Sequence, residues 1–203
     1  DVLSAVDCIK KLGVKINFKG EKCIVVGRGL NGYKFKKNLT LNAGNSGTTA
    51  RLLSATLINS NQKVKIVGDK SLEKRDMYRV INPLKKFGAK LKSKNGRLPI
   101  EIKGLKNSKP IFYNENLGSA QCKSAVMIAG LKTLGKTKLK CRPSRNHTEL
   151  MFKNVLKVPI KIRKENKYDL IELDGFKDFN SFNYNIPGDI SSAAFFIVLT
   201  LLS

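Results

Sequence analysis

Apolar and polar residues alternate along this chain in two periods, one typical of helices and one typical of strands. Val80, Leu84 and Phe87 recur at helical spacing and predict an amphipathic helix with one buried face. Residues 63–67 and 136–140 alternate lysine with apolar or β-branched residues, which predicts half-buried strands. Helices and strands that alternate in this way predict an α/β fold in which one helix-and-strand module recurs.

Two landmarks in this pattern recur with one period, which predicts internal duplication. In the first, a leading serine comes before an apolar run; the leading serines are Ser46, Ser119 and Ser191. They lie 119 − 46 = 73 and 191 − 119 = 72 residues apart. The second landmark ends a helix and starts a strand; its last residues are Ile16, Leu91 and Ile162, which are 91 − 16 = 75 and 162 − 91 = 71 residues apart. This period exceeds the usual solenoid range, so each unit is expected to be a small subdomain.

The serine-led stretches are also the best candidates for binding. Residues 45–51 read Asn-Ser-Gly-Thr-Thr-Ala-Arg and open an apolar helical run. The start of a helix leaves backbone N–H groups without partners, and the helix dipole is positive there, so such a tip attracts a phosphate or a carboxylate. We expect the three tips to be aimed at one shared pocket for anionic metabolites.

Other segments complete the predicted elements. Residues 1–12 read as a helix, and Leu150, Val155 and Leu156 are expected to form the buried face of a helix equivalent to the one at residues 79–87. The first residue is not methionine, and the final apolar helix reaches Ser203 without a capping residue or glycine. We therefore expect the sequence to be a fragment of a longer chain.

The composition allows a globular protein and raises the question of nucleic acid. The 203 residues are 41% hydrophobic and carry a formal net charge of +24. Most of the basic residues are lysines scattered through strands and loops without an arginine-rich cluster, which favours a solvated surface. A basic RNA-binding protein, such as an RNA 3′-phosphate cyclase, would show aromatic residues between clustered arginines. It stays an alternative, although the chain has no tryptophan.

The cysteines indicate a reducing compartment and no metal site. Cys8, Cys23, Cys122 and Cys141 show neither paired Cys-x-x-Cys spacing nor neighbouring histidines. They are expected to be free thiols of a cytoplasmic protein. The longest uncharged apolar stretch, residues 190–203, is too short to span a bilayer.

Five blocks, in this order along the chain, resemble the bacterial 5-enolpyruvylshikimate-3-phosphate synthases. They are residues 44–53, residues 75–77 with 83–84 and 88–89, residues 119–125, residues 144–149, and residues 187–194. The resemblance implies two domains, each built from three βαβαββ units packed around buried helices. Residues 1–186 would form most of the N-terminal domain, and residues 187–203 would begin the second.

The resemblance also implies an activity. Enzymes of this family transfer the enolpyruvyl group of phosphoenolpyruvate to the 5-hydroxyl of shikimate 3-phosphate and release phosphate, in aromatic amino-acid biosynthesis. It implies no metal, cofactor, nucleic acid or membrane, and a monomeric full-length protein. The UDP-N-acetylglucosamine enolpyruvyl transferase is the alternative with the same architecture.

Site residues follow from the same resemblance. The residues expected to bind phosphoenolpyruvate are Asn45, Gly47, Arg75 and Gln121. Those expected to bind shikimate 3-phosphate are Ser119, Gln121, Ser144 and His147. Read without the resemblance, the two serines are candidate helix caps, Arg75 a solvated residue, and His147 a locally bonded side chain. Thr48 and Arg51 are expected to shape the loop.

The resemblance is incomplete in ways that bear on catalysis. Asp76 stands where relatives usually carry proline, and Asn146 stands where they usually carry aspartate. The family's catalytic acid and base groups would lie beyond Ser203, so no catalytic residue is expected within these 203 residues. Acid–base catalysis needs such groups within hydrogen-bond reach of the reacting atoms.

Overall fold

The computed structural model describes residues 1–30, 32–176 and 179–202. Its elements in chain order are α1 (Val2–Lys11), β1 (Lys15–Lys19), β2 (Lys22–Val26), β3 (Leu39–Asn42), α2 (Gly47–Thr56), β4 (Val64–Val67), the 3-10 helix η1 (Leu72–Lys74), α3 (Tyr78–Lys86), β5 (Lys90–Lys94), β6 (Arg97–Lys103), β7 (Phe112–Glu115), α4 (Ala120–Leu131), β8 (Lys136–Cys141), α5 (His147–Leu150), the π-helical turn η2 (Met151–Val155), β9 (Ile160–Glu165), β10 (Tyr168–Asp174) and α6 (Ile190–Leu202).

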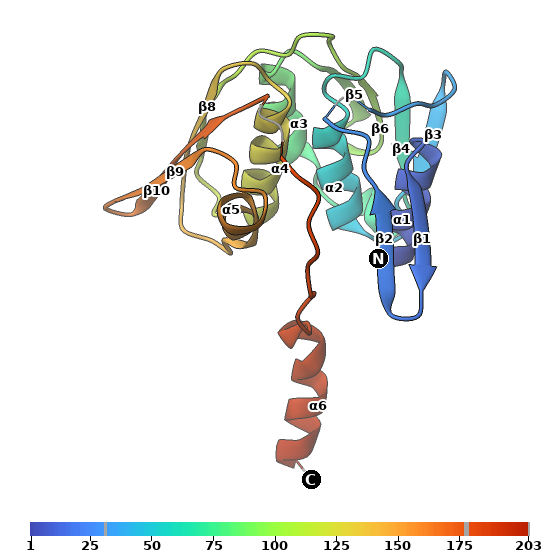
Figure 1. Ribbon diagram of the computed structural model, residues 1–203, viewed down its shortest axis with the longest axis vertical. Helices are drawn as coiled ribbons and strands as arrows, with labels where there is room; N and C mark the ends of the chain where they lie inside the picture. Colours follow the sequence, from blue (N-terminus) through green and yellow to red (C-terminus); the bar gives the residue numbers. More distant parts are fainter. Residues whose placement is uncertain (31, 177–178, 203) are drawn as a thin grey trace.

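Two four-stranded sheets with one topology confirm the predicted duplication. Their strand orders are β3-β4-β6-β5 and β7-β8-β10-β9. In each sheet the first two strands are parallel and are joined by a helix, and the remaining pairs are antiparallel. Residues 39–103 and 112–174 are therefore two copies of a βαβαββ unit (Figure 1). The α1–β1–β2 segment repeats the final helix and hairpin of such a unit.

The second sequence landmark marks the end of a helix, as predicted. The residue after each helix C-cap has a positive φ, at Gly13 (87°), Gly88 (99°) and Lys157 (51°). Glycine adopts this conformation readily, and it ends many helices there. The third copy ends its helix in the same way although a lysine occupies the position.

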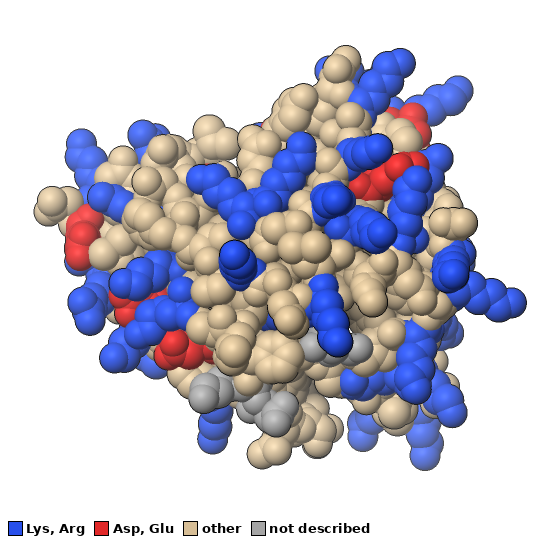
Figure 2. All heavy atoms as spheres, turned by 90° about the horizontal axis from the view of Figure 1, so that it is seen from above, with Lys and Arg blue, Asp and Glu red and all other residues tan. Residues whose placement is uncertain are grey.

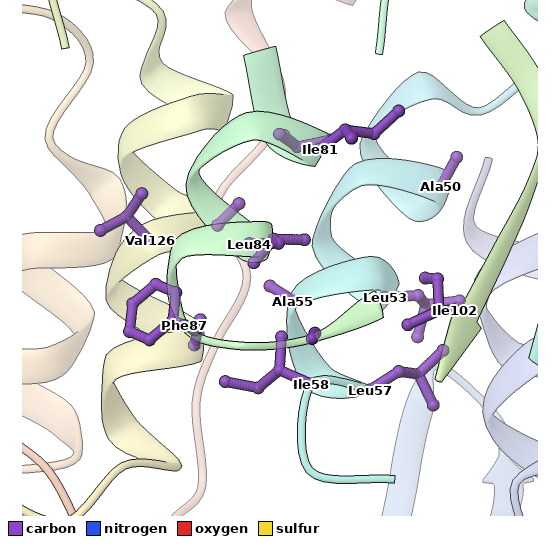
Figure 3. Packing of buried hydrophobic residues seen from close by; sticks show 14 of the residues in the cluster. Ala50, Leu53, Ala55, Leu57, Ile58, Ile81, Leu84, Phe87, Ile102 and Val126 are labelled. Atoms are coloured by element: carbon purple, nitrogen blue, oxygen red, sulfur yellow. The ribbon is translucent and has the colours of Figure 1, made fainter. Parts of the chain in front are cut away.

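The core forms where α2, α3 and α4 pack against each other and against the sheets (Figure 3). Val80, Leu84 and Phe87 are completely buried on α3, as the helical periodicity predicted. Ala55 on α2 and Val126 on α4 belong to the same buried cluster and lie on the neighbouring helices (Figure 3). These apolar contacts hold the two repeated units together, because α2 belongs to the first unit and α4 to the second.

The helix predicted around Leu150 and Leu156 differs from the observed one. The short α5 passes directly into the π-helical turn η2, and Leu150 is 46% exposed. Since a π-turn adds a residue to the helical repeat, it rotates the following side chains relative to the face that a regular helix would bury. Phe152 is buried instead, while Val155 and Leu156 are only partly buried.

The third helix tip does not join the other two, so that part of the shared-pocket prediction is wrong for this structure. The helix α6 stands apart from the two sheets at the end of an extended segment (Figure 1). Its apolar side chains are exposed, including Phe195 (80%) and Leu199 (66%). The tips of α2 and α4 alone can therefore form a common site here. Among the described residues, no helix is both long and apolar enough to cross a membrane.

Basic side chains are spread over the surface, as the sequence suggested. In the face shown in Figure 2, lysines and arginines lie across the whole surface, and the acidic side chains are few. Some lysines contact acids across the strands, such as Lys63 with Glu101 (2.8 Å) and Lys138 with Glu172 (3.4 Å). Exposed pairs of this kind contribute little to stability.

We expect one of the four cysteine thiols to react quickly in the folded protein. Cys23 is exposed, whereas Cys8, Cys122 and Cys141 are buried. Burial raises the pKa of Cys122 and of Cys141 to about 12, so their reactive thiolate forms are scarce at pH 8. Titration with an aromatic disulfide reagent should show one fast thiol in buffer and four in denaturant. Rapid reaction of all four in buffer would contradict the buried positions.

Candidate functional site

Every predicted site residue follows the carboxyl end of a parallel strand. These residues are Asn45 and Gly47 after β3, Arg75 after β4, Ser119 and Gln121 after β7, and Ser144 and His147 after β8. In α/β sheets, ligands bind outside the carboxyl ends of the strands, where the connecting loops and helix tips gather. The topology thus brings residues from four separate blocks of the sequence to corresponding edges of the two sheets.

The two helix tips are built in the same way. Asn42 at the end of β3 accepts a hydrogen bond from the Gly44 N–H (2.9 Å), and Glu115 at the end of β7 accepts one from the Gly118 N–H (2.8 Å). Four residues after each of these side chains, a serine caps the next helix. Ser46 accepts a bond from the Thr49 N–H (3.1 Å), and Ser119 accepts one from the Cys122 N–H (3.3 Å). A side chain at the strand end therefore holds the turn that orients each helix.

The helices α2 and α4 lie side by side with their N-termini together. At this end Gln121 donates to the Thr48 hydroxyl (2.7 Å) and accepts from Arg51 Nη1 (2.5 Å). At the other end the Asn59 amide donates to the Lys132 carbonyl (2.5 Å). Because the helices run in the same direction, the positive ends of their dipoles add at the tips. This end of the helix pair favours anions.

Arg75 is held at the tip of α2 by a chain of hydrogen bonds. Its Nη2 donates to the side-chain oxygen of Asn45 (2.9 Å), and the Asn45 amide donates to Asp69 (2.7 Å). The Leu72 N–H and then Asn45 lower the pKa of Asp69, so this carboxylate stays ionised. Asp69 therefore fixes the orientation of the Asn45 amide, and Asn45 positions the guanidinium of Arg75.

Gly47 lies against two guanidinium groups. A Cβ atom on Gly47 would come within 3.1 Å of Arg51 Nη1 and within 3.3 Å of Arg75 Nη1. A glycine here lets both arginines approach the first turn of α2, next to its backbone N–H groups. Two cations and a helix tip in one place can bind a group with two negative charges.

A third arginine, Arg79, lies near Arg51, as Arg75 does. The folded chain therefore does bring arginines together, which corrects the expectation of no arginine-rich cluster. Burial, followed by the charges of Arg79 and Arg75, lowers the pKa of Arg51. Arg51 also donates to the Asp76 carbonyl (3.0 Å), and its buried Nε has no hydrogen-bond partner among the described residues. Arg51 is distant in sequence from Arg75 and Arg79, and it meets them only because α2 and the segment after β4 converge.

Asp76, at the position of the usual proline, turns its carboxylate toward α3. It accepts a bond from the Tyr78 N–H (2.9 Å) and pairs with Arg79 Nε (3.4 Å). Both partners of Asp76 lie in the first turn of α3. Asp76 therefore puts a carboxylate beside Arg79, just before α3, and leaves Arg75 bonded to Asn45.

Ser144 and His147 are joined to α4 through a buried ion pair. Lys123 Nζ contacts Glu149 Oε1 (2.5 Å) and also donates to the Ser144 carbonyl (3.4 Å). The Ser144 hydroxyl oxygen is buried and has no partner among the described residues, and His147 is exposed at the start of α5. Ser144 is not a helix cap, since Asn146 precedes α5, whereas Ser119 is one. The hydroxyl proton of Ser119 can still donate to a ligand.

Several residues of this site were not assigned to it from the sequence. Arg51 was expected only to shape the loop, and Asp69, Lys123 and Glu149 were given no role. Each carries a signal in the sequence, however. Asp69 follows β4 almost directly, at the strand end where polar residues serve ligands. Lys123 is the one charged residue in the otherwise apolar or uncharged sequence of α4.

Comparison with known proteins places this chain in one family. The family model for EPSP synthase (3-phosphoshikimate 1-carboxyvinyltransferase) matches residues 1–203. The 3-phosphoshikimate 1-carboxyvinyltransferase of Ruthia magnifica subsp. Calyptogena magnifica is 46% identical over 201 residues, which cover 98% of this chain and 44% of the relative. The enzyme of that name from Caldicellulosiruptor saccharolyticus is 44% identical over 205 residues, covering 100% and 46%.

The fold agrees with the sequence matches. A solved structure of EPSP synthase from Acinetobacter baumannii is similar with a TM-score of 0.82 and 35% identity, over 97% of this chain and 44% of that one. The chain thus spans less than half the length of these relatives. Both the predicted α/β fold with βαβαββ units and the resemblance seen in the five blocks are confirmed, and the chain belongs to the EPSP synthase family.

Proposed function

We propose that this chain provides substrate-binding groups for the transfer of the enolpyruvyl group from phosphoenolpyruvate to the 5-hydroxyl of shikimate 3-phosphate. The observation that carries the proposal is the convergence of Arg51, Arg75 and Gln121 at the paired tips of α2 and α4. The relatives named above are called 3-phosphoshikimate 1-carboxyvinyltransferases, which favours this acceptor over UDP-N-acetylglucosamine.

The charges of the two substrates fit the groups at the tips. Phosphoenolpyruvate and shikimate 3-phosphate each carry a phosphate and a carboxylate, so four anionic groups must be held close together. Planar guanidinium forks bind such oxyanions through two parallel hydrogen bonds, and the helix N-termini add backbone donors. Arg75 and Gly47 would hold phosphoenolpyruvate, with Asn45 positioning Arg75.

The second substrate would lie along α4. Ser119 at the tip, together with Ser144 and His147 after β8, would contact shikimate 3-phosphate. Gln121 lies between the two groups, because its side chain already contacts Thr48 and Arg51 on α2. It would therefore touch both substrates and fix their relative position, which is the main requirement when two molecules react.

The chemistry in the proposal is addition followed by elimination. The 5-hydroxyl adds to the enol carbon while the methylene carbon gains a proton, and phosphate then leaves the tetrahedral intermediate. The arginines would stabilise the departing phosphate. The acid and base are proposed to lie beyond Ser203, with residues 1–186 forming most of one domain and residues 187–203 starting the other. A monomeric, cytoplasmic full-length protein completes the proposal.

The 203-residue chain is expected to bind shikimate 3-phosphate weakly and not to turn over. Calorimetry would measure binding, and a phosphate-release assay with both substrates would measure turnover. A Ser119→Ala variant should bind more weakly, by the loss of a charge-assisted hydrogen bond of about 1.5–3 kcal/mol. Turnover by the purified chain would refute the proposed position of the acid and base, and wild-type binding by Ser119→Ala would refute the assignment of Ser119.

A further inference from the structure

A cavity lies at the opposite end of the α2–α4 pair from the arginine group. It has a volume of about 590 Å³ and is lined by residues that include Tyr33, Thr56, Asn59, Gln62 and Lys132. This volume is in the range of pockets that hold small molecules. Thr56 is the last residue of α2 and Lys132 follows α4, so one helix length of about 15 Å separates the cavity from the arginine group.

Lys132 is the unusual residue of this cavity. It is 7% exposed, and none of the ion pairs among the described residues includes it. Its Nζ lies 5.2 Å from the ring centroid of Tyr33. Burial lowers its pKa to about 8, so most of the molecules still carry the charge at pH 7. A buried ammonium beside an aromatic face and without an ion-pair partner among the described residues gains much from an anionic ligand.

The charges around the cavity favour an anion. Lys34 and Lys106 also line it, and its described lining residues include no aspartate or glutamate. The C-terminal ends of α2 and α4 oppose this preference, since each contributes roughly half a negative charge. Three lysines outweigh these two partial charges.

Two amide oxygens specify what else the ligand must carry. Asn59 Oδ1 and Gln62 Oε1 are buried, and neither has a hydrogen-bond partner among the described residues. The Asn59 side-chain nitrogen already donates to the Lys132 carbonyl. This bond fixes the Asn59 side-chain oxygen on the side of the amide that faces away from that carbonyl. Buried acceptors without donors are costly, so a ligand with O–H or N–H groups is favoured over a bare anion.

We propose that this cavity is a second anion site, which binds a small oxyanion bearing hydroxyl donors between Lys132 and the amide oxygens of Asn59 and Gln62. Monophosphates of hydroxylated compounds have this chemistry. The ligand contacts the C-terminal ends of both α2 and α4, and the same two helices carry the arginine group at their N-termini. The site is independent of the proposed enolpyruvyl transfer.

Inorganic phosphate is the first probe, and sulfate is the comparison ion, because at pH 6 it has the same tetrahedral shape and a higher negative charge but no O–H donor. In amide ¹H–¹⁵N spectra of the 203-residue chain at pH 6, phosphate should shift Thr56, Asn59 and Lys132, and should bind there about fivefold or more tightly than sulfate. Lys132→Met should weaken the phosphate affinity measured from these three amides at least tenfold and leave the phosphate-induced shift at Gly47 unchanged. Arg75→Gln should weaken the phosphate-induced shift at Gly47 and leave the affinity measured at Thr56, Asn59 and Lys132 unchanged.

Two further variants keep the result interpretable. Lys86→Met is the control, because Lys86 lies 5.3 Å from the ring centroid of Tyr113 and outside the cavity lining; it should bind like wild type. Gln62→Glu adds a negative charge to the cavity lining without changing the size of the side chain and should also weaken phosphate binding, so it tests the site even if Lys132→Met perturbs the fold. The proposal is overturned if phosphate shifts none of the three amides, if both cavity variants bind like wild type, or if sulfate binds as tightly as phosphate.

Discussion

Replacing Lys123 with methionine should lower the free energy of unfolding by about 3–5 kcal/mol, the cost of leaving one charge of a buried ion pair without its partner. Lys123 is completely buried, and Glu149 is 4% exposed with one oxygen already unpartnered among the described residues. Urea denaturation would measure the loss, and for a chain of this size the melting temperature should fall by roughly 6–20 °C. The Ser144 carbonyl would also lose its contact with Lys123.

Two comparisons test whether burial causes this effect. Lys63→Met breaks the exposed pair with Glu101 and should cost less than about 1 kcal/mol. The double variant Lys123→Met/Glu149→Leu removes both buried charges and should recover most of the stability lost by the single variant. If Lys123→Met and Lys63→Met cost the same, the pair is not buried in solution.

Replacing Arg75 with glutamine should weaken binding of phosphoenolpyruvate by roughly 30-fold or more, because truncating one partner of a charge pair in a binding site costs about 2–5 kcal/mol. The binding would be measured by calorimetry in the presence of saturating shikimate 3-phosphate. Arg75→Lys should restore only part of the affinity, since lysine keeps the charge but lacks the planar fork that Asn45 orients.

Arg97 provides the matched control for charge. It is an exposed arginine at the start of β6 and lies outside the group at the helix tips. Arg97→Gln should change the affinity less than about twofold and the stability by less than about 0.5 kcal/mol. Equal losses of affinity in the two variants would mean that net charge, and not the geometry at Gly47, holds the ligand.

The repeat and its elements could be predicted because periodicity records which face of each element is buried. Val80, Leu84 and Phe87 are buried together, and the strands at residues 63–67 and 136–140 appear as β4 and β8. The helix near Leu150 could not be predicted, since a π-turn changes the period on which such a prediction depends. The sequence of α6 did not predict that this helix stands apart from the two sheets (Figure 1).

The candidate site was predictable only in part, for a different reason. Asn45, Gly47, Arg75 and Gln121 were identified by resemblance, and the structure connects them through Arg51. The contributions of Arg51, Asp69 and Lys123 arise from contacts between residues 24 to 70 positions apart. Such contacts depend on which loops the sheet topology brings together, and no local pattern records that.

The most direct test is a residue-resolved titration of the 203-residue chain with shikimate 3-phosphate, followed in amide ¹H–¹⁵N spectra. The binding account predicts the largest shifts at Ser119, Gln121, Ser144 and His147, whose backbones follow the carboxyl ends of β7 and β8. Shifts confined to the β1–β2 hairpin or to α6, with none at these four amides, would contradict it.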